Sequence, residues 1–297
     1  MEENYLSPVF AGRSAADRDF LRQIDGRSGF SLFWLDISAP MLDALGIKHL
    51  LEVGADRGQH TRWLLGYCRE HAGTLTVIEP RPHEQLDELV AGQRGVCLMR
   101  ETSAAVLPNL SVAPEAVFLE GDLNFAAVSH DLQALQELGQ RRGGEWPVTF
   151  VSAVGWPYAR RDMYYEPERL PKSWRHEFAR RGMSPWSAEL VAGGINAPFA
   201  NANREGGVKN GVLTAVEDFV AAQAGLALWL LPVNHGFGIV YDMNSNAAPY
   251  VQSHLKIPAA MQRLLATIEV ARINEILRRQ QAGRRPWYRR LARLVYG

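Results

Sequence analysis

The sequence predicts an α/β fold in which helices cover both faces of a mostly parallel β-sheet. From residue 47 onward, short apolar runs alternate with helical patterns, as in consecutive βαβ units. A glycine turn at residues 54–58 follows the first apolar run and leads straight into a helical pattern. The next apolar run ends on Glu79. This order of strand, glycine turn, helix and acidic strand end is typical of domains that bind an adenosine-containing cofactor.

The remaining elements follow from local patterns along the chain. Residues 1–45 are expected to form a helical segment whose aromatic side chains need a surface to cover. Strands are expected at 48–53, 74–79, 95–100, 116–120 and 148–153, and again at 226–231 and 238–243, the last two as an antiparallel pair at the sheet edge. Helices are expected at 59–71, 82–91, 103–107, 124–139, 210–224 and 258–282.

These elements divide the chain into three parts. Residues 1–45 are a helical preface, residues 46–245 the main domain, and residues 246–297 a helical extension with a basic tail. Within the main domain, residues 155–209 break the alternation and are rich in Trp, Tyr, Pro, Arg, Gly and Asn. A long insertion in a compact domain is more often functional than idle, so we expect a lid over a binding site.

Composition narrows the classes of partner. The chain has 297 residues with 32 basic and 32 acidic side chains, so its net charge of zero gives no case for nucleic-acid binding. Cys68 and Cys97 lie inside a helical and a strand pattern, which favours buried thiols in a reducing compartment. The N-terminus lacks the pattern of a signal peptide, and no apolar run reaches transmembrane length. We therefore expect a cytoplasmic protein.

The basic tail leaves two alternatives open. Residues 278–297 contain seven arginines and no acid. As a helix that begins at Pro286, the tail would have one apolar and one basic face, which suits weak contact with the anionic inner face of a membrane. The other interpretation is a helix that docks its apolar face on the domain. Oligomeric state is equally open, and a homo-oligomer is one alternative.

The glycine turn discriminates between cofactors. A dinucleotide site would need G-x-G-x-x-G, whereas only Gly54 and Gly58 are present here. Asp56 stands where the middle glycine would admit a pyrophosphate, and its charge would repel phosphate. A nicotinamide oxidoreductase is therefore disfavoured. The spacing E-x-G-x-x-x-G, starting at Glu52, instead resembles motif I of the class I S-adenosylmethionine-dependent methyltransferases.

Further motifs extend this resemblance over residues 30–245. EGDLNF at 120–125 and GWPYARRDMYY at 155–165 are similar to the IDGDHNY and HDVGWPYGRRDLYY of one bacterial branch of the family, and REGGVKNGVLTAVEDF at 204–219 also matches that branch. The resemblance implies a Rossmann-like fold with a seven-stranded, mostly parallel sheet and an antiparallel last strand. It also implies S-adenosylmethionine as cofactor and a hydroxyl acceptor on a saccharide or small metabolite, as in polysaccharide biosynthesis.

The same resemblance, with the strand-end positions, gives the candidate site. Residues expected to bind the cofactor lie mainly at strand ends, with Glu79 on the ribose hydroxyls: Glu52, Gly54, Asp56, Gly58, Thr61, Glu79, Ser103 and Glu120. A hydroxyl acceptor needs a base, for which Asp122 is the first candidate and His235 the second. The alternative role of Asp122 is a cap at the strand end, and that of His235 is an ordinary turn residue.

Aromatic side chains beside arginines suit a sugar or an anionic group. The insertion therefore supplies the candidate substrate contacts: Trp156, Tyr158, Arg160 and Arg161. The alternative is a lid whose aromatic side chains pack against one another.

The chain departs from the branch where a metal would bind. Leu123 replaces the usual His, and Ser152-Ala153 replaces the usual His-Asp. A hard cation needs several oxygen ligands, and Ala153 supplies none, so we expect a site without a divalent metal. The same substitutions favour the rival hypothesis of a catalytically degenerate, cofactor-binding or partner protein.

Overall fold

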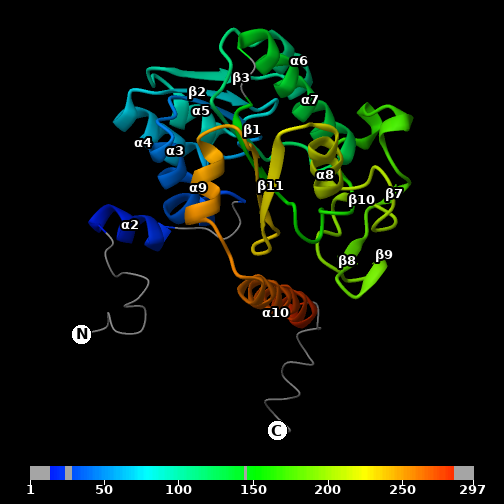
Figure 1. Cartoon of the computed structure of the whole chain (residues 1–297). Helices are drawn as coiled ribbons and strands as arrows, with labels where there is room; N and C mark the ends of the chain where they lie inside the picture. Colours follow the sequence, from blue (N-terminus) through cyan, green and yellow to red (C-terminus); the bar gives the residue numbers. More distant parts are fainter. Residues whose placement is uncertain (1–13, 24–28, 144–145, 284–297) are drawn as a thin grey trace, which may run out of the picture.

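The computed structural model describes residues 14–23, 29–143 and 146–283. A seven-stranded sheet crosses its centre in the order β11-β12-β5-β4-β1-β2-β3 (Figure 1). The strands are β1 (His49–Val53), β2 (Thr74–Ile78), β3 (Val96–Met99), β4 (Ala116–Leu119), β5 (Val148–Ser152), β11 (Leu226–Leu231) and β12 (Phe237–Asp242). Strand β12 runs antiparallel to β5 and β11, and the other pairs in this sheet are parallel. The predicted fold class, with its antiparallel last strand, is confirmed.

Helices cover both faces of the sheet (Figure 1). One layer contains α3 (Ala39–Ala44), α4 (Thr61–His71), α5 (Glu84–Val90) and α9 (Ala247–His254), and the other contains α6 (Ser103–Val106), α7 (Phe125–Arg142) and α8 (Val212–Ala222). Alternate residues of a strand point to opposite faces, and β4 shows this clearly. Phe118 packs into the first layer, while Val117 and Leu119 pack into the second. The sheet is therefore buried on both sides.

The N-terminal segment completes the first layer. Helix α2 (Ala15–Gln23) is followed by a 3₁₀ turn at Ser31–Phe33 and a π-helical turn at Trp34–Ser38. Phe30, Phe33 and Trp34 are all buried, and the Phe33 ring stacks on Phe237 with centroids 4.3 Å apart. The aromatic residues of the preface thus cover the sheet next to β12.

The insertion is built from short strands and turns rather than from a continuation of the sheet. It contains a three-stranded sheet of β6 (Met163–Tyr164), β10 (Ala200–Ala202) and β7 (Phe178–Ala179), and a hairpin of β8 (Gly182–Ser184) and β9 (Ser187–Val191). Two 3₁₀ turns, Pro167–Arg169 and Lys172–Trp174, lie between β6 and β7. The Trp156–Pro157 peptide bond is cis.

The last helix, α10 (Ala259–Gly283), matches the helix expected at 258–282 and lies beside the β8–β9 hairpin (Figure 1). None of the helices within the described ranges is long and apolar enough to cross a membrane. The predicted amphipathic tail helix and its membrane contact fall in residues 284–297, outside the described part of the chain.

Candidate active site

The glycine turn after β1 depends on backbone conformations that favour glycine. Gly54 has φ +83°, and a Cβ there would lie 2.5 Å from the carbonyl oxygen of Glu120 at the end of β4. Gly58 has φ +76°, and its amide donates to the Ala55 carbonyl at 2.7 Å. A side chain in this left-handed region costs about 1–2 kcal/mol before any clash. The ends of β1 and β4 can therefore meet closely only with glycine at position 54.

Glu79 holds this turn from the end of β2. Its Oε2 accepts hydrogen bonds from the amides of Ala55 and Asp56, both at 3.1 Å, and its Oε1 accepts from the Arg81 amide at 3.1 Å. An ionised carboxylate has about four lone-pair sites, so these three bonds leave about one site for a further donor. The Glu79 side chain is only partly buried. The structure thus places the predicted ribose-binding carboxylate at the glycine turn.

Glu52 lies behind the turn rather than in front of it. Its side chain is buried, and its two oxygens bind His60 Nδ1 at 3.1 Å and the Thr61 hydroxyl at 2.6 Å. His60 and Thr61 stand at the start of α4, so the three side chains tie β1 to that helix. This geometry gives Glu52 and Thr61 a role in positioning the turn, in place of the direct cofactor contact expected from the sequence.

Two further acidic residues follow β4. Burial raises the pKa of the Glu120 carboxyl to about 8, and the nearby Glu52 carboxylate adds to the rise. Asp122 is exposed to solvent. The pKa of its carboxyl nevertheless lies above its ordinary value, because the group loses water and, second, because Asp131 repels its charge. Ser103, expected to contact the cofactor, hydrogen-bonds Asp131. The structure therefore gathers the carboxyl groups of Glu79, Glu120 and Asp122 at the carboxyl ends of β2 and β4. We call this end of the sheet the acidic edge.

The insertion reaches this acidic edge at Tyr165 and Glu166. Glu166 Oε1 forms an ion pair with Arg81 Nη1 at 2.6 Å, close to the Glu79 strand end. The pKa of the Tyr165 hydroxyl is raised by loss of water and then by a group of nearby carboxylates: Glu120, Asp122, Asp56 and Glu79. The Tyr165 side chain is still 46% exposed. The insertion thus borders the candidate site, as expected of a lid.

Two of the predicted substrate contacts are instead part of the lid's own structure. The Arg161 side chain is fully buried, where it donates to the Ala202 and Ala188 carbonyls. The Tyr158 hydroxyl, also buried, donates to Asn201 Oδ1 at 3.2 Å and accepts from Asn196 Nδ2 at 3.0 Å. Because neither polar group reaches an open surface, both residues hold the insertion together rather than touch a ligand.

The two other predicted contacts remain nearer the surface. Arg160 ties the insertion to α8 through Glu217 at 2.7 Å and the Thr214 hydroxyl at 3.1 Å. Trp156 is partly buried, and its carbonyl oxygen is 3.1 Å from His235 Nδ1. Direct contact of Trp156 or Arg160 with a substrate stays a prediction.

His235 is enclosed by the turn and by α10. Arg272 Nη2 lies 3.2 Å from His235 Nε2, and because a guanidinium only donates, Nε2 acts as the acceptor. His235 Nδ1 then carries the proton and donates to the Trp156 carbonyl. Burial lowers the pKa of the imidazole. With both ring nitrogens engaged, the geometry favours a structural role for His235 over that of a base.

Sequence reasoning missed the side chains that assemble the insertion and dock α10. Asp162 is buried and accepts hydrogen bonds from the Phe125 and Gly211 amides, both at 2.7 Å, at the starts of α7 and α8. Glu269 accepts from the Asn234 and His235 amides at 3.0 Å each. The position of Asp162 directly after Arg-Arg in the GWPYARRD motif was a usable signal, because a carboxylate that is buried with this motif needs hydrogen-bond partners. Glu269 carried no local signal.

A metal site is not evident in this edge. Among the residues that the structure describes, no three or more His, Cys, Asp or Glu side chains are grouped to hold a metal ion. Ala153, at the end of β5, has no ligand atom in its side chain, and Asn124 uses its side-chain oxygen to cap α7 through the Ala127 amide at 2.9 Å. The absence of a metal from the working protein stays a prediction.

Comparisons with known proteins give distant structural similarity and no match in sequence. No model of a protein family and no curated protein sequence matches the chain. The S-adenosylhomocysteine-bound Podospora anserina methyltransferase PaMTH1 aligns with TM-score 0.44 and 14% identity over 82% of this chain and 97% of that one.

A Staphylococcus aureus protein provisionally described as a caffeoyl-CoA O-methyltransferase aligns with TM-score 0.44 and 11% identity over 81% and 98% of the two chains. An rRNA methylase from Streptococcus thermophilus aligns with TM-score 0.36 and 10% identity over 73% and 97%. We draw no conclusion about the fold, substrate or mechanism of this protein from similarities with TM-scores below 0.5.

Proposed function

We propose that this protein transfers a methyl group from S-adenosylmethionine to a hydroxyl on a saccharide or small metabolite. The observation that carries the proposal is the pairing of the glycine turn with Glu79. The carboxylate at the end of β2 accepts the turn's own amides at 3.1 Å, and with the Arg81 amide also bound it keeps about one lone-pair site for a further donor. The E-x-G-x-x-x-G turn and the EGDLNF segment, which resemble class I methyltransferases, follow β1 and β4 at this same end of the sheet.

The residues present suit the proposed cofactor. Glu79 would accept the ribose hydroxyls, and the turn at 54–58 would lie against the amino-acid part. Asp56 would add negative potential, which favours a cationic ligand over a phosphate. When bound, S-adenosylmethionine supplies a methyl group on a positively charged sulfur. The protein's task is then to align the acceptor oxygen with that carbon and to exclude water.

Asp122 is the proposed general base. Its carboxylate lies at the end of β4, is exposed to an incoming acceptor, and has a pKa above its ordinary value. A base whose pKa lies closer to working pH takes a proton more readily. Tyr165, whose hydroxyl pKa is raised by loss of water and then by the nearby carboxylates, would cover the acceptor from the insertion.

Turnover tests this function. We would incubate the protein with methyl-labelled S-adenosylmethionine and a panel of methyl glycosides and catechols, and measure labelled product and S-adenosylhomocysteine. Asp122→Asn is expected to lower kcat by about 100-fold or more, in the range known for removal of a general base. Asp218→Asn, on the exposed surface of α8, is the matched control and should turn over normally.

The degenerate partner protein is the second candidate, favoured by Leu123 and Ser152-Ala153 where the resembling branch carries His and His-Asp. Tight binding of cofactor without transfer to any acceptor of the panel would support it and contradict the enzyme proposal. No binding of cofactor would contradict the enzyme proposal and leave a partner protein as the better account.

A further inference from the structure

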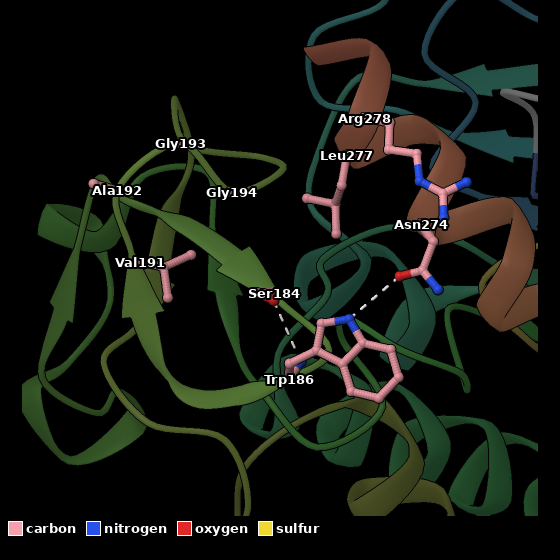
Figure 2. Close-up of a pocket in the computed structure, with 9 residues that line it drawn as sticks. All are labelled: Ser184, Trp186, Val191, Ala192, Gly193, Gly194, Asn274, Leu277 and Arg278. Carbon is pink, nitrogen blue, oxygen red and sulfur yellow. Dashed lines mark hydrogen bonds between the residues drawn. The ribbon is translucent and has the colours of Figure 1, made fainter. Parts of the chain in front are cut away.

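A pocket of about 520 Å³ lies between the β8–β9 hairpin and α10 (Figure 2). This volume is within the range of roughly 300–1,000 Å³ that is usual for small-molecule sites. The hairpin side contributes Trp186 and a glycine-containing loop, and α10 contributes Asn274, Leu277 and Arg278. The pocket is distinct from the acidic edge described above and includes none of the predicted site residues.

An exposed aromatic face forms one wall. The Trp186 side chain is 71% exposed, which is unusual for so large an apolar group. Its indole Nε1 nevertheless donates to Asn274 Oδ1 at 3.3 Å, and its backbone amide donates to the Ser184 hydroxyl at 3.3 Å (Figure 2). The ring is therefore held open to solvent by a hydrogen bond between two distant elements. Such a flat apolar face suits the C–H face of a sugar ring.

The opposite lining supplies polar and cationic groups. The Arg278 side chain is 76% exposed, and Glu275 is 3.9 Å from its guanidinium, which is too long for a strong ion pair. Its N–H groups are thus available for a carboxylate, which a guanidinium can bind through two parallel hydrogen bonds.

Helix α10 connects this pocket to the candidate active site. Arg272 and Glu269 contact the turn at 234–236 through His235. The same turn contacts the segment just after β5, where the Gly155 amide donates a hydrogen bond to the His235 carbonyl at 2.6 Å. Arg278 follows Arg272 by six residues, which is about 9 Å along a helix. Helix α10 therefore lines the pocket at one end and contacts the turn that follows β11 nearer its middle.

We propose that this pocket is an outer acceptor subsite for a pyranose that carries a carboxylate, with the ring on Trp186 and the carboxylate on Arg278. The proposal rests on the methyltransferase function proposed above for its role as an acceptor subsite. Binding energy from such a remote unit would orient the reacting hydroxyl at the cofactor.

Saturation-transfer NMR and titration with methyl α-glucuronide and the neutral methyl α-glucoside test the subsite. We expect the glucuronide to bind the full-length protein more tightly than the glucoside. Trp186→Ala should weaken both by about tenfold, as expected for loss of a stacking contact worth roughly 1.4 kcal/mol. Arg278→Gln should reduce the glucuronide to the affinity of the glucoside.

Two exposed residues outside the pocket provide matched controls: Trp174→Ala and Arg263→Gln should bind both glycosides as the unaltered protein does. Failure of both glycosides to bind, or unchanged binding by Trp186→Ala, would overturn the subsite. A parallel titration of the same samples with S-adenosylhomocysteine separates the two proposals. Normal cofactor binding without glycoside binding refutes the subsite alone, whereas glycoside binding without cofactor binding refutes the proposed methyltransferase and leaves a saccharide-binding pocket.

Discussion

The Glu120 carboxyl should make the stability of the protein fall as pH rises. Its pKa in the folded protein is about 8, against 4.5 for the ordinary side chain, because burial and the nearby Glu52 disfavour the charge. Between these values the folded chain holds a proton that the unfolded chain has released. The free energy of unfolding is therefore highest below pH 4.5 for this group and declines until the folded carboxyl ionises near pH 8.

The size of the effect follows from the shift. Where the folded carboxyl is protonated and the unfolded one is ionised, the free energy of unfolding falls by about 1.4 kcal/mol per pH unit. Between roughly pH 5.5 and 7.5 the fall is therefore up to about 3 kcal/mol. Glu120 keeps some contact with water, so we expect about 1–2 kcal/mol over that interval.

Urea unfolding at the two pH values measures the change. Glu120→Gln should remove that share of the decline and be more stable than the unaltered protein at about pH 7.5. Glu88→Gln, which alters an exposed carboxylate on α5, should keep the original profile. Parallel profiles for the protein and Glu120→Gln would refute the reasoning.

Three further substitutions probe the supports of the site. Gly54→Ala should destabilise the fold by about 2–4 kcal/mol in urea unfolding, through backbone strain and a collision with the end of β4; a loss under about 0.5 kcal/mol would contradict this. Asp162→Ala should cost about 3–5 kcal/mol, because it leaves buried amides of α7 and α8 unpaired, and a normal melting temperature would count against that role. Arg272→Ala should raise the pKa of the His235 imidazole in an NMR titration, since a nearby positive charge is lost; an unchanged value would mean that Arg272 does not face the ring.

The central sheet could be predicted because each strand is a local apolar run bounded by turn residues. The strands expected at 48–53 and 74–79 lie at His49–Val53 and Thr74–Ile78. The glycine turn and Glu79 were also readable, since their conformation and position follow from the adjacent strands. For these features, short-range sequence carries most of the information.

The insertion and the docking of α10 could not be predicted in the same way. Strands β6 and β10 are two and three residues long and pair across more than thirty residues of chain, so no periodicity marks them. Arginine beside aromatic residues fits a ligand site and a buried lid equally well, and the burial of Arg161 distinguishes them only in three dimensions. The bond from Asn234 to Glu269 likewise spans 35 residues.

Calorimetric titration with S-adenosylhomocysteine and S-adenosylmethionine, with and without magnesium, tests the central claim most directly. We expect binding near about 1–100 μM to the unaltered protein, independent of magnesium, and at least a tenfold loss in Glu79→Gln, whose amide is a weaker acceptor for ribose hydroxyls. Glu84→Gln, an exposed residue at the start of α5, should bind normally. The absence of binding by either compound to the correctly folded, unaltered protein would contradict the assignment of this edge as a cofactor site.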